Sequence, residues 1–248
     1  KENQRTTNDE QRTNRMSEAL DRVRGITRLP LFPLPVVLFP GTPLPLHIFE
    51  PRYREMLADI QITNNLFALP YWDASETEAT RPEIGTLGCV AEVRQVQPLE
   101  DGRSNILTVG IVRFRLEDYA DTADSYFVGE VSYFEDDKED EEFLEQRAVA
   151  VKDLFLRVAQ GTRDIAGTRG ELPDLPEITP EHLSFFVAAA IDFDIKMKYE
   201  MLAMRSTGER LKRLHDFLAQ AVQTVEERAK MSKLAQTNGH GKKRIDFE

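Results

Sequence analysis

The chain has 248 residues, of which 41% are hydrophobic and 30% are charged, and its formal net charge at pH 7 is −11. That length is enough for one large domain or two small ones and for a sizeable buried core. The acidic balance argues against broad binding to a nucleic-acid backbone, which needs clustered lysine and arginine side chains. No run of about 18 uncharged apolar residues occurs, so we expect no membrane span.

Residues 1–27 are almost entirely polar, and we interpret them as a tail with a short helix around Ser17–Val23. This tail contains no apolar core of the kind found in signal peptides. The single cysteine, Cys89, cannot form an intramolecular disulfide, which fits a reducing compartment. We therefore expect a cytoplasmic protein.

The segment from Leu29 combines proline with apolar residues. Seven prolines fall in the 22 residues from Pro30 to Pro51, and the gaps between them hold Leu, Val, Phe and Ile. Proline removes a donor from a sheet ladder, so it occupies strand starts, edges and bulges. These short, interrupted apolar runs predict short strands of a curved sheet rather than a solvated linker.

A helix is predicted to begin at Pro51, whose fixed φ suits the first helical position. One apolar stripe follows at the spacing i, i+3, i+4, i+7. It consists of Tyr53, Met56, Leu57 and Ile60. Farther along, "NLFALPYW" predicts a strand and "DASETEATRPEIG" a polar loop.

The clearest β-rich stretch contains a hairpin signal. The pair Asp101-Gly102 separates two β-rich runs, Cys89–Val96 and Ile106–Val109. Apolar residues then alternate with charged ones, which predicts a strand with one buried and one solvated face. The face predicted to be buried holds Val112, Phe114 and Leu116, and the solvated face holds Arg113, Arg115 and Glu117.

The acidic run of residues 135–142 marks a boundary, because helical periodicity follows it. We expect several helices beyond this run, the last of which begins at a capping box formed by Ser206 and Glu209. These patterns predict an α+β fold. Its four parts are a polar N-terminal tail over 1–27, a β-rich subdomain over 28–134, a helical subdomain over 135–229 and a polar C-terminal tail over 230–248.

The sequence shows no group of residues typical of an enzyme. Cys89 lies between apolar neighbours in a predicted strand, where a cysteine ordinarily serves as a small buried hydrophobe. The four histidines have no i, i+4 pairing, and no paired cysteines occur. A phosphate-binding loop is also missing. We therefore expect no catalytic residue, no metal site and no cofactor.

Two clusters are candidates for binding a partner. In Glu50-Pro51-Arg52-Tyr53, the structural interpretation is a charge at a helix N-terminus and a packed tyrosine, and the functional one is a corner that lines a groove. Tyr71 and Trp72 are either amphipathic anchors for a partner or a cap on the core. The predicted peptide-binding residues are Phe49, Glu50, Arg52, Tyr53, Tyr71 and Trp72.

Three ordered blocks resemble the N-terminal, substrate-recognition domain of Lon-type ATP-dependent proteases. They are "LPLFPLPVVLFPGTPLPLHIFEPRYREML", "IGTLGCVAEVRQVQPLEDGRSNILTVGIVRFRL" and "LSFFVAAAIDFDIKMKYEMLAMRSTGERLKRLHDFL". The blocks cover roughly residues 28–225. The "FEPRY" motif is similar to the free-standing bacterial members and to the Lon-like domain of cereblon. The resemblance implies a PUA-like β pseudobarrel with one helix, followed by a C-terminal helical bundle.

The same resemblance implies a module that binds polypeptide without catalysis. It would hold unfolded, extended or degron-bearing segments and deliver them to a separate protease or chaperone. The ATPase module and the Ser-Lys peptidase domain of Lon have no counterpart in these 248 residues, so we expect no enzymatic activity, even where a peptidase family name is attached. The alternative is RNA binding by the PUA-like barrel through Arg103, Arg113 and Arg115, and the net charge argues against nucleic acid as a partner.

Overall fold

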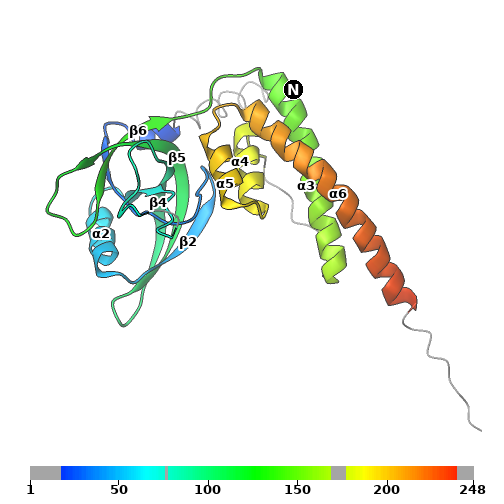
Figure 1. The fold of residues 1–248 in the computed structure, drawn as a ribbon, viewed down its shortest axis with the longest axis horizontal. Helices are drawn as coiled ribbons and strands as arrows, with labels where there is room; N and C mark the ends of the chain where they lie inside the picture. The colour runs from blue at the N-terminus through cyan, green and yellow to red at the C-terminus, as the bar shows by residue number, and fades with distance from the viewer. Residues whose placement is uncertain (1–17, 76–77, 169–176, 239–248) are drawn as a thin grey trace, which may run out of the picture. The chain divides into compact units, whose positions relative to one another are not determined.

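The computed structural model describes residues 18–75, 78–168 and 177–238 of the chain (Figure 1). The chain divides into two compact units. One unit consists of the described residues of Lys1–Asp137 and Phe185–Arg205, and the other of those of Lys138–Ser184 and Ser206–Glu248. The first unit carries the sheet, and the second is helical. Residues 185–205 thus pack with the sheet-bearing unit, although the sequence places them in the helical part.

Six strands form one antiparallel sheet in the first unit. They are β1 (Arg28–Pro30), β2 (Pro43–Ile48), β3 (Leu66–Pro70), β4 (Leu87–Pro98), β5 (Ser104–Ala120) and β6 (Val128–Phe134). Neighbouring strands follow the order β1-β6-β5-β4-β3, and β2 is an additional strand that pairs with β5. The predicted α+β class is confirmed. No regular ladder closes the sheet within the described residues, but the parallel bridges Leu31–Ala68 and Leu34–Tyr71 link the segment after β1 to β3 and its end.

The prolines lie at the ends and the edge of the sheet, as the sequence predicts. Pro30, Pro70 and Pro98 are the last residues of β1, β3 and β4. Pro43 and Pro45 lie in β2, which pairs with β5 alone among the described strands and so has an open edge. Such an edge tolerates proline, because a nitrogen that faces away from the neighbouring strand has no ladder bond to lose.

The helix predicted at Pro51 is α2 (Pro51–Gln61), which lies beside the sheet in Figure 1. Its buried face is the predicted stripe, formed by Tyr53, Met56, Leu57 and Ile60. These side chains share one core cluster with residues of the sheet. Burying a large apolar side chain contributes about 1.5–3 kcal/mol. Packing of this face, more than helix propensity, therefore holds the short helix in place.

The described part of the N-terminal segment is attached to the sheet. Val23 is 1% exposed and belongs to a core cluster with Leu29 and Phe114. The Arg22 Nη2 atom lies 2.7 Å from Glu92 Oε1, which ties the same segment to β4. Ala19 and Ile26 pack against the same cluster, so the interpretation of residues 1–27 as a polar tail overlooked the short apolar spacing Ala19, Val23 and Ile26.

One part of the alternation predicted for β5 is wrong. The apolar residues of the pattern are buried as expected, but Arg113 is also buried, at 1% exposed. Its guanidinium donates to Asp136 Oδ1 and to the carbonyl oxygens of Leu202 and Met204. These carbonyls stand at the end of α5 (Ile195–Ala203), where a helix has acceptors without helical partners. The burial of Arg113 thus depends on a helix that lies far away in the sequence.

The second unit contains two long helices, α3 (Glu141–Ala166) and α6 (Thr207–Asn238), which pack side by side (Figure 1). Asp140 caps α3, because its Oδ1 accepts from the backbone N–H of Phe143 at 2.8 Å. The predicted capping box is present in one direction, since Ser206 Oγ accepts from the N–H of Glu209 at 3.0 Å.

Helix α4 (Pro180–Ala190) contributes to both units, because the division falls between Ser184 and Phe185. At the other end of the chain, α6 continues to Asn238, past Lys230, where the sequence pattern places the start of a tail. Residues 239–248 of the predicted tail lie outside the described residues.

Candidate functional site

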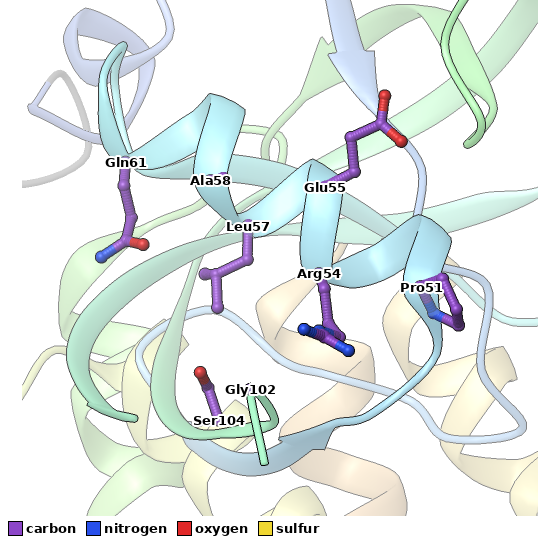
Figure 2. A pocket seen from close by; sticks show the side chains of 8 residues that line it. All are labelled: Pro51, Arg54, Glu55, Leu57, Ala58, Gln61, Gly102 and Ser104. Atoms are coloured by element: carbon purple, nitrogen blue, oxygen red, sulfur yellow. The ribbon is translucent and has the colours of Figure 1, made fainter. Parts of the chain in front are cut away.

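An open pocket of about 530 Å³ lies in the first unit, between α2 and the turn that joins β4 to β5. Figure 2 shows the side chains that line it. They belong to Pro51, Arg54, Glu55, Leu57, Ala58, Gln61, Gly102 and Ser104. Its volume falls within the range of about 300–1,000 Å³ that is typical of ligand sites. This pocket is the candidate functional site.

One wall of the pocket is the outer face of α2. The helix begins at Pro51, and the N–H groups of residues 53 and 54 both donate to the Glu50 carbonyl, at 3.1 and 3.0 Å. Because the apolar stripe faces the core, the residues between the stripe positions face outward. Arg54, Ala58 and Gln61 recur at i, i+4 and i+7 and are all exposed. The helix therefore supplies a guanidinium, a methyl group and an amide to the same wall.

The opposite wall is the predicted hairpin turn. The N–H of Leu99 donates to the Arg103 carbonyl at 2.8 Å, which closes the turn. Gly102 has a φ of 77°, in the left-handed region that favours glycine. A Cβ atom at Gly102 would stand 2.3 Å from Nη2 of Arg54. The missing side chain is thus what lets the Arg54 guanidinium lie against the turn.

The charges around the pocket are unevenly paired. Asp101 accepts hydrogen bonds from Arg103, which lowers the pKa of the Asp101 carboxyl to about 2. Glu55 Oε2 accepts from Ser125 Oγ at 2.7 Å, and Figure 2 shows the Glu55 side chain pointing away from the turn. The Arg54 guanidinium, in contrast, has no ion-pair or hydrogen-bond partner among the described residues. Of the two charged residues that line the pocket, Arg54 and Glu55, the one that faces the turn is therefore the unpaired cation.

The pocket lies within the region that identifies the chain. The model of the ATP-dependent protease La (LON) substrate-binding domain family matches residues 28–220. The chain belongs to the Lon substrate-binding domain family. The resemblance that the three sequence blocks indicate is therefore confirmed, and both walls of the pocket are parts of the Lon domain.

The curated relatives of this Lon domain are much longer proteins. The Lon protease of Parabacteroides distasonis is 30% identical over 158 residues, which are 60% of this chain and 19% of that protein. The Lon protease of Aquifex aeolicus is 26% identical over 221 residues, which are 85% of this chain and 27% of that protein. The chain thus spans about a fifth to a quarter of the length of the Lon proteases it matches.

Two solved structures share the fold of this Lon domain. The Lon N-terminal domain protein of Xanthomonas campestris is 22% identical, with a TM-score of 0.55, and the match covers 76% of this chain and 97% of that one. The N-terminal domain of the Mycobacterium avium complex Lon protease is 18% identical, with a TM-score of 0.58, and the match covers 77% of this chain and 98% of that one. At these identities the likeness shows the fold alone.

The corner predicted at residues 49–53 stands beside the pocket along the chain. Phe49 is 58% exposed, and its ring stacks 6.0 Å from that of His47. Arg52 Nη2 lies 2.8 Å from Glu50 Oε2 at the surface. Tyr53 is 6% exposed, with its ring in the core and the Arg52 guanidinium 4.5 Å above it. Phe49, Glu50 and Arg52 are thus accessible to a partner, whereas Tyr53 acts through packing.

Tyr71 and Trp72 lie after β3 and do not line the pocket. The Tyr71 ring is 5.5 Å from that of Tyr199, whose hydroxyl accepts from the N–H of Leu87 at 2.9 Å. The backbone N–H of Trp72 donates to the Leu34 carbonyl, and its buried Nε1 has no hydrogen-bond partner among the described residues. The structure does not bring these two aromatic residues to the pocket, and their role in peptide binding stays a prediction.

None of the six residues predicted to bind peptide lines the pocket. Arg54, Gln61 and Ser104 were not among the predicted residues, although the outward face of α2 follows directly from its apolar stripe. The turn at Asp101-Gly102 was predicted as well. What the sequence lacks is any signal that this turn lies against α2, because the two segments are remote along the chain.

Other kinds of site find no support in the described part of the chain. There, no group of three or more His, Cys, Asp or Glu side chains could hold a metal ion. Cys89 is fully buried, and this burial raises the pKa of its thiol to about 12, so the thiol stays protonated near neutral pH. No described helix combines the length and the apolar composition needed to cross a membrane.

Proposed function

We propose that the chain is a module that binds unfolded, extended or degron-bearing polypeptide and catalyses no reaction. The observation that supports this most directly is the match of the Lon substrate-binding domain family across residues 28–220. The matched Lon proteases are about four to five times longer than the matched segments, as their coverage of 19% to 27% indicates. A share of this size fits the recognition part of such a protein.

The binding site we propose is the pocket together with the adjacent corner at Phe49. The pocket offers the apolar edge of Leu57 and the polar groups of Arg54 and Gln61, and Phe49 adds an exposed aromatic ring. An unfolded segment presents apolar side chains and backbone amides together, so a mixed surface of this kind suits it. Glu50 and Arg52 stand at the rim, and Tyr71 and Trp72 are a second proposed contact.

We further propose that the chain passes its clients to a separate protease or chaperone in the cytoplasm. The support is the relation to Lon, because a recognition domain acts through the machinery to which it delivers. Catalysis by the single cysteine is disfavoured, since Cys89 is buried and its raised pKa, about 12, leaves no thiolate nucleophile at neutral pH.

RNA binding has less support than polypeptide binding. That alternative needs Arg103, Arg113 and Arg115 on one surface. Arg113 is only 1% exposed, and Arg103 Nη2 is paired with Asp101 at 2.5 Å. Only Arg115 of the three is both exposed and outside such a pair. Strong retention of a structured RNA that falls steeply with salt would reverse this preference.

The test of polypeptide binding uses the full chain and a fluorescently labelled client, reduced and unfolded casein. Fluorescence anisotropy is expected to show saturable binding, and gel analysis is expected to show an intact client with and without ATP. A folded protein of similar acidity in place of the chain provides the control. If casein and cross-linked partners from cell extract are retained no better by the chain than by this control, the proposed function is wrong.

A further inference from the structure

We infer that the pocket between α2 and the β4–β5 turn recognises a carboxylate of the bound polypeptide, and that Arg54 is the residue that pairs with it. This inference rests on the proposed function and deepens it by naming the chemical group that the pocket selects. The carboxylate has two sources in a polypeptide, an acidic side chain and the chain's C-terminus. Both present the same planar, negatively charged group to an arginine.

The position of the Arg54 side chain supports this inference. In Figure 2 its side chain extends from α2 toward Gly102 and Ser104 on the opposite wall. The guanidinium lies so close to the turn that a Cβ atom at Gly102 would be 2.3 Å from Nη2 and 3.1 Å from Cζ. Contact with the turn restricts the side chain before any ligand arrives. A planar guanidinium held in this way can form two parallel hydrogen bonds with one carboxylate.

The two neighbouring carboxylates do not pair with Arg54: Asp101 has an arginine partner of its own, and Glu55, which keeps its charge, is directed away from the turn. Asp101 is paired with Arg103 at 2.5 Å, and Glu55 accepts from Ser125 and points away from the turn. Arg54 is the only cationic side chain that lines the pocket, and it has no partner among the described residues. A ligand carboxylate would therefore meet a guanidinium that no carboxylate of the described residues already pairs with.

The remaining walls offer contacts to the part of a polypeptide that carries the carboxylate. Leu57 is 5% exposed and forms an apolar part of the lining together with Pro51 and Ala58. The pocket is open to solvent, so these apolar groups serve as contacts for the aliphatic part of a ligand side chain. Gln61 and Ser104 supply neutral polar groups to the same lining. These groups can bond to the backbone amides that flank a carboxylate in a peptide.

The overall charge of −11 repels an acidic ligand, so any attraction to a carboxylate must come from a local cation. At physiological ionic strength the screening length is about 8 Å, so most of the distant negative charges contribute little inside the pocket. Attraction to a carboxylate then depends on Arg54 itself. Removing this one cation should abolish the preference, whereas removing an exposed cation elsewhere should leave it unchanged.

The experiment measures binding of labelled ten-residue peptides to the full chain by fluorescence anisotropy. The first peptide has a free C-terminus and no acidic side chain, the second has an amidated C-terminus and one internal glutamate, and the third has an amidated C-terminus and no acidic side chain. At least one of the first two is expected to bind about tenfold more tightly than the third, which is about 1.4 kcal/mol. The peptide that gains affinity identifies the source of the carboxylate.

Variants then assign the preference to the pocket. Arg54→Gln is expected to reduce the tenfold preference to nearly one, and Arg54→Lys to retain part of it, because lysine keeps the charge without the planar donor pair. Arg115→Gln removes an exposed arginine of β5 in the same unit and should keep the preference. Thermal unfolding of each variant shows whether it is folded.

Two outcomes separate this inference from the proposed function. If unfolded casein binds but the three peptides bind equally, or Arg54→Gln retains the preference in a folded variant, the carboxylate inference is wrong and polypeptide binding stands. If neither casein nor any peptide binds to the wild-type chain, the proposed function is wrong, and the inference is wrong with it.

Discussion

Arg113 occupies a strand position where a charge would normally face water. It is 1% exposed, and its partner Asp136 has a side chain that is 4% exposed. Beyond this ion pair, the guanidinium donates to two carbonyl oxygens at the end of α5 and lies 4.6 and 5.2 Å over the rings of Phe134 and Phe185. A buried cation is tolerated only when its donors are satisfied in this way. One residue thus ties β5, β6, α4 and α5 together within the first unit.

Arg113→Ala is expected to destabilise the first unit by about 3–5 kcal/mol, because Asp136 would stay buried without its partner. Urea unfolding followed by the fluorescence of Trp72, the single tryptophan, measures this loss. Replacing both partners, as Arg113→Met with Asp136→Leu, should recover much of it. The exposed Arg115→Ala should change stability by no more than about 0.5 kcal/mol. Equal effects of Arg113→Ala and Arg115→Ala would contradict the expectation.

Glu135 stands beside the same pair and gives stability a pH dependence. Burial raises the pKa of its carboxyl, Arg113 lowers it and Asp136 raises it further. A raised folded-state pKa contributes stability that is present below the unfolded value, about 4.3, and lost as pH rises through the folded value. Glu135→Gln should therefore leave stability near pH 4 almost unchanged and increase it at neutral pH. Urea midpoints of both proteins between pH 4 and 8 provide the measurement, and parallel curves would refute the assignment.

Among the helices, the pairing of α3 with α6 depends on a glycine. Gly161 is buried, and a Cβ atom there would lie 2.4 Å from Cγ1 of Val225 on α6. Because a β-branched side chain has little rotamer freedom in a helix, the two helices would have to separate. Gly161 therefore sets how closely these two helices approach, although glycine is a poor helix former.

Gly161→Ala is expected to destabilise the second unit by about 1–3 kcal/mol through this overpacking. In a Val225→Ala background the clash is gone, and the same change should stabilise the unit by up to about 1 kcal/mol, the difference in helix propensity. Thermal unfolding of the wild type, the two single variants and the double variant is followed by circular dichroism at 222 nm. Additive effects of the two substitutions would show that the helices do not meet at this pair.

Across the whole molecule, local patterns were predictable and distant contacts were not. The stripe of α2, the Asp101-Gly102 turn and the Ser206 cap are each encoded within a few neighbouring residues, and each is present. The burial of Arg113 depends on α5, and the pocket depends on Gly102 lying against Arg54. No periodicity links such distant segments, so these features appear only once the chain is folded.

The division into two units leads to a prediction for the molecule as a whole. The first unit has its own core around the sheet, and the second buries Ala148 and Val151 of α3 with Leu211 and Leu214 of α6. Separate cores permit each unit to open without the other. Hydrogen exchange read by mass spectrometry should therefore show faster exchange in β5, β6 and α5 after Arg113→Ala, with α3 and α6 unchanged. Gly161→Ala should instead accelerate exchange in α3 and α6 and leave exchange in β5, β6 and α5 unchanged. Uniform acceleration across both units by either variant would mean that the chain unfolds as one cooperative body.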